Sequence, residues 1–381
     1  MKILHIIPSL NPNLGGVCKA VRDIIYGLEK GNSNFTNEVL CLDNPDEKYI
    51  KNEQFKVHAL GDSKTSWSYS KTLLKWLYNF SGNYDQIIVH GLWQYQSYAI
   101  YKAWQKYQFK YYVMPHGMLD PYFQKAPERK LKAIRNIFFW KYVEKKLINN
   151  SYAILFTCNL EKELARTTFN GYNAKKEFVI GLGVAPPPQY NQQSIINFNN
   201  KFKIDDKYLL FLSRIDHKKG IDILLKAYQM NIDKIPYKLI VAGPLDSLYA
   251  QNLIKTYQSE NIIFTGMLQG DEKWAAIYGA NLFILPSHQE NFGIAIVEAM
   301  ACGKPVAITR QVNIYDVIEN CNAGFVFDDN YESICEALKE ISDTSIEDMN
   351  KKGNIAKDAY LKNYLPEIFV ENLIKYLDPN D

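Results

Sequence analysis

Short apolar runs alternate with segments of helical period along almost the whole chain, and this rhythm limits most strongly how the chain can fold. A strand–helix–strand order requires crossover connections, which make neighbouring strands parallel in a helix-covered sheet. The expected strands cover 2–7, 38–42, 55–60, 86–90, 110–114, 153–156 and 177–180, and after a break 208–212, 238–242, 262–265, 281–285, 305–309 and 324–327. The sequence therefore predicts an α/β protein with two Rossmann-like parallel-sheet domains facing across a cleft.

The break between the two sets of strands covers residues 185–206, where three consecutive prolines precede a Gln/Asn-rich stretch with little periodicity. We therefore place the first domain at 1–185 and the second at 206–360. Helical patterns at 345–362 and 365–377 follow the last strand with no further strand. We expect the C-terminal helix, within 361–381, to pack back on the first domain.

Charge divides the chain in the same way. Residues 1–190 contain 25 Lys and Arg against 15 Asp and Glu, whereas residues 191–381 contain 19 against 26. A basic first half predicts contact with something anionic, which can be nucleic acid, a membrane surface or a phosphorylated substrate. The alternative is that the surface charge of the two domains differs without any functional reason.

Cysteine usage and the apolar runs predict the compartment. The six cysteines show no C-x-x-C and no zinc-finger spacing, so we expect neither a disulfide framework nor a structural zinc site. The longest apolar runs are too short to span a bilayer, and residues 1–8 resemble a buried strand more than a signal peptide. These features favour a cytoplasmic protein.

The segment 281–300 contains the most informative motif. An apolar strand ends at Pro286, a polar turn holds Glu290, and a helical pattern begins near Ile294. A helix that starts at the carboxyl end of a strand points its unsatisfied N–H groups toward a ligand, which favours an anion. Glu298 lies one turn into that helix, so it and Glu290 can border one ligand. A buried glutamate that caps neighbouring backbone is the structural alternative.

A second turn, within 211–220, has the same strand–turn–helix form and includes Arg214 and Lys219. A guanidinium and an ammonium at a strand end can neutralise a diphosphate. Two solvated surface cations are the alternative.

The first half contributes weaker signals after its own strands. Gly15 and Gly16 open a helix and let a phosphate approach the backbone, although the dinucleotide pattern G-x-G-x-x-G is absent. His116, followed by Asp120, can contact a sugar hydroxyl or a phosphate oxygen, act in proton transfer, or be structural. Trp93 can stack on an acceptor sugar or belong to the core.

Taken together, these motifs resemble the retaining GT-B glycosyltransferases of family four, and the resemblance extends over nearly the whole chain. It implies a UDP- or GDP-linked sugar as co-substrate, with a hexose or N-acetylhexosamine as the transferred group and no other cofactor. For the nucleotide, the resemblance implies that Arg214 and Lys219 contact the diphosphate, Glu298 contacts the ribose, and Gly15 and Gly16 contact phosphate. For the donor sugar, it implies contacts from Glu290 and from the backbone N–H groups of Phe292, Gly293 and Ile294, while His116 contacts the sugar or its leaving phosphate. Trp93 and Asp120 are the implied contacts with the acceptor.

The same resemblance implies retention of anomeric configuration. We favour front-face attack, in which the leaving phosphate accepts the acceptor's proton, over a covalent intermediate on Glu290. The sequence contains no D-x-D and no H-E-x-x-H, so we expect no metal ion.

Two basic, aromatic-rich segments, 125–146 and 66–80, resemble amphipathic helices suited to anionic lipid. They predict peripheral attachment to the inner membrane and a lipid-linked or oligosaccharide acceptor of the surface polysaccharide type. The alternative is that their apolar sides pack on the sheet.

Two other functions stay open at this point. One is a sugar-nucleotide epimerase of the same architecture, and the other is a non-catalytic sugar- or nucleic-acid-binding protein. No nucleic-acid motif accompanies the basic half, so we expect no nucleic-acid partner.

Overall fold

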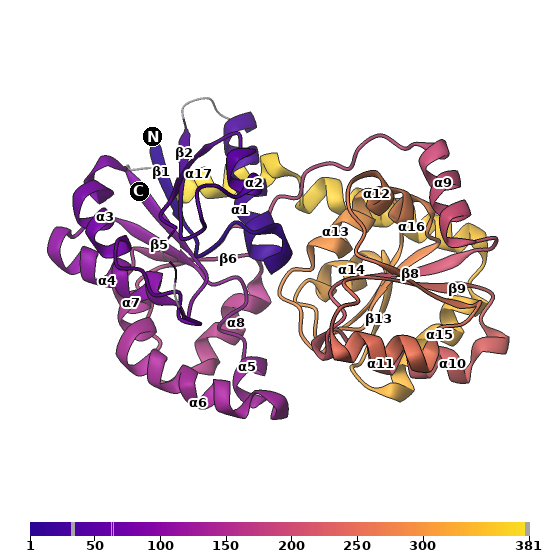
Figure 1. Cartoon of the computed structure of the whole chain (residues 1–381). Coiled ribbons are helices and arrows are strands. Elements are labelled where there is room, and N and C mark those ends of the chain that lie inside the picture. The colour runs from indigo at the N-terminus through magenta and orange to yellow at the C-terminus, as the bar shows by residue number, and fades with distance from the viewer. Residues whose placement is uncertain (32–34, 62, 64, 378–381) are drawn as a thin grey trace. The chain divides into compact units, whose positions relative to one another are not determined.

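The structure is a computed structural model of the 381-residue chain, and it describes residues 1–31, 35–61, 63 and 65–377. The chain divides into two compact units (Figure 1). The first unit comprises Met1–Ala185 and Pro366–Asp381, and the second comprises Pro186–Leu365. Residues 378–381, which belong to the range expected for the C-terminal helix, lie outside the described residues.

A parallel sheet of seven strands, in the order β3-β2-β1-β4-β5-β6-β7, forms the centre of the first unit. The chain builds the sheet outward from β1 on one side and from β4 on the other. Connections after these two central strands therefore leave in opposite directions, which opens a crevice at their carboxyl ends. The strands are β1 (Lys2–Ile6), β2 (Thr36–Cys41), β3 (Lys56–Ala59), β4 (Gln86–His90), β5 (Tyr111–Met114), β6 (Ala153–Phe156) and β7 (Glu177–Val179).

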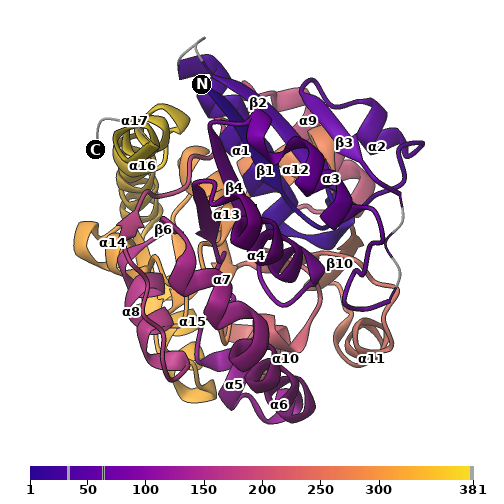
Figure 2. The same cartoon turned by 90° about the vertical axis from the view of Figure 1, so that its left-hand side faces the viewer.

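Helices cover both faces of this sheet (Figure 2). Alternate residues of one strand enter different cores, because successive side chains of a strand point to opposite faces. Leu40 of β2 packs in a large cluster with β4 and β5, whereas Val39 packs with residues of α1. The helices are α1 (Gly16–Gly31), α2 (Lys48–Lys51), α3 (Leu73–Phe80), α4 (Tyr95–Tyr107), α5 (Tyr122–Lys125), α6 (Lys130–Phe139), α7 (Lys145–Asn150), α8 (Asn159–Thr168) and α17 (Pro366–Leu377).

Helix α17, drawn in yellow in Figure 1, belongs to the first unit although it ends the described chain. It packs across α1, where Gly27 permits a close approach: a Cβ at that position would lie 3.1 Å from Cγ2 of Val370. Leu373 and Leu377 are buried, and the side-chain amide of Gln86 donates to the Leu377 carbonyl at 3.3 Å. The end of the chain thus completes the core formed by its beginning.

The second unit contains six parallel strands in the order β10-β9-β8-β11-β12-β13. The order reverses between β8 and β11, which again places a crevice at the carboxyl ends of the two central strands. The strands are β8 (Tyr208–Leu212), β9 (Lys238–Ala242), β10 (Ile262–Gly266), β11 (Leu282–Leu285), β12 (Val306–Thr309) and β13 (Gly324–Phe327), and the helices are α9 (Gln192–Phe202), α10 (Ile221–Met230), α11 (Leu248–Tyr257), α12 (Gly270–Gly279), α13 (Ile294–Ala301), α14 (Tyr315–Cys321), α15 (Tyr331–Asp343) and α16 (Ile346–Asn363).

Two segments differ from what the sequence predicts. The polar stretch 185–206 contains helix α9, which the side chain of Asn191 caps by accepting from the Ser194 N–H, and which buries Ile195 and Phe198 in the second unit. The many Gln and Asn residues of α9 leave only a short apolar side, so the sequence shows little helical periodicity there. The segment 66–80 is helical only from Leu73 onward.

No helix in the described part of the chain is long and apolar enough to cross a membrane.

Leu373→Ala is expected to destabilise the first unit by about 2–5 kcal/mol, because it leaves a cavity between α17 and α1. Urea unfolding followed by tryptophan fluorescence measures this loss, since five of the six tryptophans lie in residues 1–185. Leu361→Ala, at an exposed leucine of α16, is the matched control and should change stability little. Equal effects of the two substitutions would contradict this packing.

Candidate functional site

A cavity of about 480 Å³ lies in the first unit where β1, β2 and β4 end. Its apolar wall includes Ile7, Leu42 and Met118. Its polar lining includes Ser9, Asp43, Ser63, Ser68, His90 and Gln94. An apolar hollow with a few convergent polar groups is the usual form of a small-molecule site.

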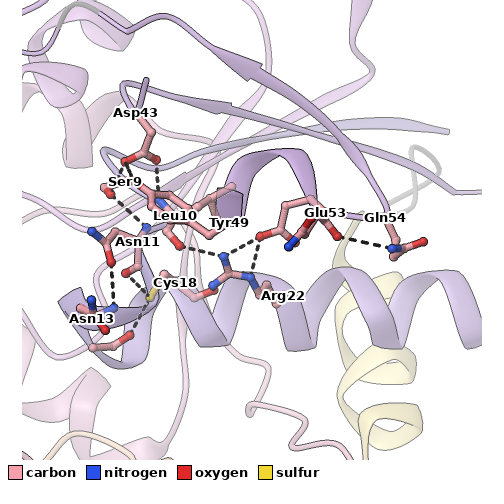
Figure 3. A network of polar contacts seen from close by, with 12 residues as sticks. Ser9, Leu10, Asn11, Asn13, Cys18, Arg22, Asp43, Tyr49, Glu53 and Gln54 are labelled. Atoms are coloured by element: carbon pink, nitrogen blue, oxygen red, sulfur yellow. Dashed lines mark hydrogen bonds and ion pairs between the residues drawn. The ribbon is translucent and has the colours of Figure 1, made fainter. Parts of the chain in front are cut away.

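Asp43 lines this cavity and orders the residues beside it; Figure 3 shows its polar contacts. One of its carboxylate oxygens accepts from the Ser9 hydroxyl at 2.5 Å and from the Tyr49 hydroxyl at 3.1 Å. The other accepts from the Leu10 N–H at 2.7 Å. Sequence analysis did not single out this aspartate, whose only signal is its place directly after a buried strand.

The loop from β1 to α1 is held from a second side (Figure 3). Arg22 donates to the Leu10 carbonyl at 2.7 Å and pairs with Glu53 at 2.5 Å. Gly15 has φ +104°, and a Cβ there would meet no atom within 4 Å, so its backbone faces open space. Gly16 begins α1. This arrangement leaves the Gly15–Gly16 backbone accessible beside the cavity wall.

His116 ends a row of three histidines that crosses the sheet from β1 to β5. His5 Nδ1 lies 3.0 Å from His90 Nε2, and His90 Nδ1 lies 3.0 Å from His116 Nε2. His5 Nε2 lies 3.2 Å from the side-chain oxygen of Asn37. Burial lowers the pKa of His5 and of His116 to about 4, and lowers the pKa of His90 well below its ordinary value. All three imidazoles are therefore neutral near pH 7.

The turn at His116 is held by Glu161, a residue that sequence analysis missed. His116 and Gly117 both have positive φ, at 52° and 78°. One carboxylate oxygen of Glu161 accepts from the Gly117 N–H at 2.6 Å, and the other accepts from the N–H and hydroxyl of Thr157 at 2.8 and 2.7 Å. These bonds fix the backbone that carries His116.

Trp93 and Asp120, the expected acceptor contacts, are both engaged within the first unit, and neither lines the cavity. The Trp93 ring packs against Phe169 at 5.4 Å between centroids, and its indole N–H donates to the Met118 carbonyl. Asp120 accepts from the Tyr122 N–H at 2.8 Å at the start of α5. Both residues therefore support the loops around the site.

Glu144 is a fully buried carboxyl group behind the Trp93 loop. It accepts from the Trp93 N–H at 2.7 Å and lies in a π-helical turn, Trp140–Glu144, between α6 and α7. Burial raises the pKa of Glu144 to about 8, so the group is protonated at neutral pH.

The second unit places Lys219 and Glu290 in direct contact. Lys219 follows β8, Glu290 follows β11, and the ammonium forms an ion pair with the carboxylate. The Lys219 side chain is only 8% exposed. Burial alone would raise the pKa of Glu290, but the charges of Lys219 and Lys218 outweigh it and lower this pKa. The predicted strand-end turns thus meet through opposite charges.

Glycine at position 220 is required for this contact. Gly220 has φ +64°, and a Cβ there would lie 2.0 Å from the Pro286 carbonyl oxygen. The Lys218 carbonyl also accepts from the His288 N–H at 2.9 Å. Backbone therefore packs on backbone where the two turns meet, which fixes the positions of Lys219 and Glu290 relative to one another.

The remaining expected donor contacts lie on the same edge of the sheet. Glu298 is 3% exposed on α13 and pairs with Lys273 of α12 at 2.6 Å, a partner that sequence analysis did not identify. Gly293 caps α13 with φ +73°, and Ile294 is its first residue. The Phe292 side chain is buried, edge-on to Tyr364. The Arg214 side chain is exposed.

Three further side chains near the Lys219 turn could share a metal ion. One ligand atom from each of His217, Asp222 and His288 lies within 4.8 Å of the others. His288 Nδ1 also contacts an oxygen of Asp329 at 2.6 Å. His288 lies 71 residues after His217 in the sequence, so no short sequence motif could indicate that these residues lie close together.

Residues 192–360 match the family described as Glycosyl transferases group 1. An alpha-monoglucosyldiacylglycerol synthase of Streptococcus pneumoniae is 29% identical over 241 residues, which cover 58% of this chain and 54% of that protein. A capsular polysaccharide biosynthesis glycosyltransferase, CapM of Staphylococcus aureus, is 25% identical over 203 residues, or 50% of each chain. The chain spans about half the length of these relatives.

Among solved structures, Anabaena Alr3699/HepE in complex with UDP and glucose superposes with a TM-score of 0.78 at 16% identity, covering 99% of both chains. With the seven- and six-stranded parallel sheets, this likeness confirms the predicted GT-B fold.

Glu144→Gln is expected to stabilise the protein by on the order of 4 kcal/mol at pH 8 and by less than about 1 kcal/mol at pH 5. The folded state holds the Glu144 proton more tightly than the unfolded state, so stability is lost as pH rises from about 4.5 toward 8. Glutamine keeps an oxygen for the Trp93 N–H and carries no charge.

Urea unfolding across this pH range measures the effect. Glu163→Gln, at an exposed glutamate of α8, is the control and should leave the pH dependence unchanged. A Glu144→Gln variant that tracks the unaltered protein at every pH would show that Glu144 does not carry the buried proton.

Proposed function

We propose that the protein is a retaining glycosyltransferase. It transfers a hexose or N-acetylhexosamine from a UDP- or GDP-linked donor to a hydroxyl of a lipid-linked saccharide, in surface polysaccharide assembly at the cytoplasmic face of the inner membrane. The observation that carries the proposal is the Lys219–Glu290 pair, held beside the start of α13 where β8 and β11 end, within the region that matches the glycosyltransferase family. The UDP-bound Anabaena structure of the same fold supports a nucleotide-sugar donor.

The chemistry explains why such a pair suits this reaction. Breaking the bond between the anomeric carbon and the phosphate leaves a nucleoside diphosphate with growing negative charge. Lys219, Arg214 and the N–H groups at the start of α13 can stabilise this charge without a metal ion. Diphosphate binding would draw Lys219 toward phosphate and free the Glu290 carboxylate to accept from sugar hydroxyls.

The same pair favours the front-face route. In that route the bond to phosphate breaks, the acceptor oxygen bonds to the anomeric carbon on the same face, and the leaving phosphate oxygen takes the hydroxyl proton. A covalent route would need Glu290 as the nucleophile. In the front-face route the Glu290 carboxylate, once Lys219 has turned to the phosphate, accepts from sugar hydroxyls instead, and the leaving phosphate acts as the base.

Helix α6 supports a membrane-bound acceptor. Its large apolar side chains are mostly exposed: Leu131 is 85% exposed and Phe138 is 59% exposed, with Ile134 and Ile137 also exposed. Tyr142, in the π-helical turn that follows, is exposed as well. Lys132 and Arg135 of α6 and Lys141 of that turn lie among them, while Ala133 and Asn136 of α6 and Trp140 of the turn form the buried side. The other basic, aromatic-rich segment, 66–80, behaves differently: its apolar side packs on the core of the unit, where Leu73 and Leu77 are buried. Both views place α6 at the periphery of the first unit (Figures 1 and 2).

Glu290→Ala and Lys219→Ala are each expected to lower the rate of sugar transfer by about two to three decades, because each removes a group that acts on the donor. Lys219→Ala should also weaken the thermal stabilisation by UDP or GDP, which is roughly 2.7 kcal/mol at 100 times the dissociation constant.

Transfer is measured with radiolabelled nucleotide sugars and a lipid-linked acceptor. Lys234→Ala, at an exposed lysine in the loop before β9, is the control and should retain activity. Full activity in either site variant, or rearrangement of the nucleotide sugar in the absence of acceptor, would contradict the proposal, and the second result would identify an epimerase.

A Leu131→Glu/Phe138→Glu double variant is expected to lose at least about tenfold in binding to vesicles that contain phosphatidylglycerol. Each substitution removes apolar area that lipid would bury and adds a repelling charge. Vesicle flotation measures the partitioning. Met230→Glu, at a 71% exposed methionine of α10, is the matched control. Equal flotation of all three proteins would contradict membrane contact through α6.

A further inference from the structure

The three histidines of the first unit form a continuous chain of hydrogen bonds between neighbouring strands. His5 lies in β1, His90 ends β4, and His116 follows β5. Adjacent ring centroids are 5.3 Å apart, and the ring planes differ by 22° and 29°. With N···N distances of 3.0 Å, these values place the facing nitrogens on the line between ring centres. The contacts are therefore in-plane hydrogen bonds and not face-to-face stacking.

Proton counting couples the three rings. A neutral imidazole has one N–H and one nitrogen with a lone pair, so a ring that donates at one nitrogen must accept at the other. His90 is bonded on both sides, to His5 and to His116. If His90 donates to His5, it must accept from His116. All bonds of the chain thus point in one direction, and the group at its far end selects that direction.

Asn37, on β2, is the group at that far end. Its side-chain oxygen faces His5 Nε2 at 3.2 Å, and a carbonyl oxygen can only accept. The proton of His5 therefore lies on Nε2, which leaves Nδ1 to accept from His90 Nε2. By the same step His116 donates from Nε2 to His90. Asn37 is 3% exposed and His5 and His90 are fully buried, so bulk water does not compete for these bonds.

We propose that His5, His90 and Asn37 are positioning residues that fix the proton of His116 on Nε2, so that its Nδ1 is a hydrogen-bond acceptor for a hydroxyl group of the sugar substrate. This inference rests on the proposed function. It decides between the two ligand groups that the sequence leaves open for His116, a sugar hydroxyl and a phosphate oxygen. A phosphate oxygen in its anionic form carries no proton to donate, and a lone pair on Nδ1 would repel it; a sugar hydroxyl donates to Nδ1.

Nitrogen NMR of the full-length protein with ¹⁵N-labelled histidine tests the assignment directly. The expected spectrum at pH 7 shows pyrrole-type Nε2 and pyridine-type Nδ1 for His5, His90 and His116. Single His→Gln variants assign the signals. A pyrrole-type Nδ1 at His116, or a protonated imidazolium there, would overturn the proposal. Because the signals of the six histidines can also be assigned in the native protein by correlation with backbone resonances, the measurement remains decisive if a variant fails to fold.

Asn37→Leu supplies the second test. Leucine is close to asparagine in volume but offers no acceptor to His5, so His116 is expected to give exchange-averaged or Nδ1-protonated signals. The transfer rate kcat should fall about tenfold, with a smaller change in KM for the donor. His58→Gln is the matched control. It removes a histidine of the same unit that binds Glu38 and takes no part in the row of three histidines. An unchanged His116 spectrum in Asn37→Leu would overturn the role of Asn37.

Failure of this inference is distinguishable from failure of the proposed function. Transferase activity together with a pyrrole-type Nδ1 at His116 would reject the fixed tautomer and leave the enzyme assignment intact. The expected spectrum in a protein that transfers no sugar would reject the assignment and, with it, the hydroxyl contact.

Discussion

The reversal of strand order at the centre of each sheet is the constraint on which the rest of the structure depends. The order reverses between β1 and β4 in the first unit and between β8 and β11 in the second. Connections on either side of each reversal diverge, so the loops after the central strands do not cover one another. Apart from His116, which follows β5 beside the reversal, the residues with a candidate role in catalysis or donor binding lie on such a loop or on the first turns of the helix that follows.

The two units use buried polar groups in opposite ways at these edges. The first unit keeps its buried imidazoles neutral, and each proton is committed to a neighbour in the chain from Asn37 to His116. The second unit buries a charge pair, Lys219 and Glu290, whose mutual attraction offsets the loss of hydration. A neutral acceptor suits a hydroxyl, whereas a cation that can exchange its partner suits a diphosphate. The chemistry of the proposed reaction needs both.

Helix α6 shows how burial, more than sequence pattern, separates an exposed apolar surface from a core. The segments 66–80 and 125–146 share the same mixture of lysines and aromatic residues. In the first of them Leu73 and Leu77 contact the sheet, and in the second Leu131 and Phe138 face outward. The two segments have the same kind of composition, and only packing against the remainder of the unit decides which apolar side chains are buried and which are exposed.

The sequence by itself determined the strands, their parallel arrangement and the strand-end motifs, because apolar periodicity and turn residues are local properties of the chain. It did not reveal helix α9, whose polar residues hide two buried side chains, nor the supports Asp43, Glu144 and Glu161, which are lone acidic residues without a motif. Only the tertiary structure decided that His5, His90 and His116 form one chain and that Lys273 pairs with Glu298. These partners lie between 25 and 85 positions apart, and no local pattern records which side chains the sheet order brings within hydrogen-bond distance.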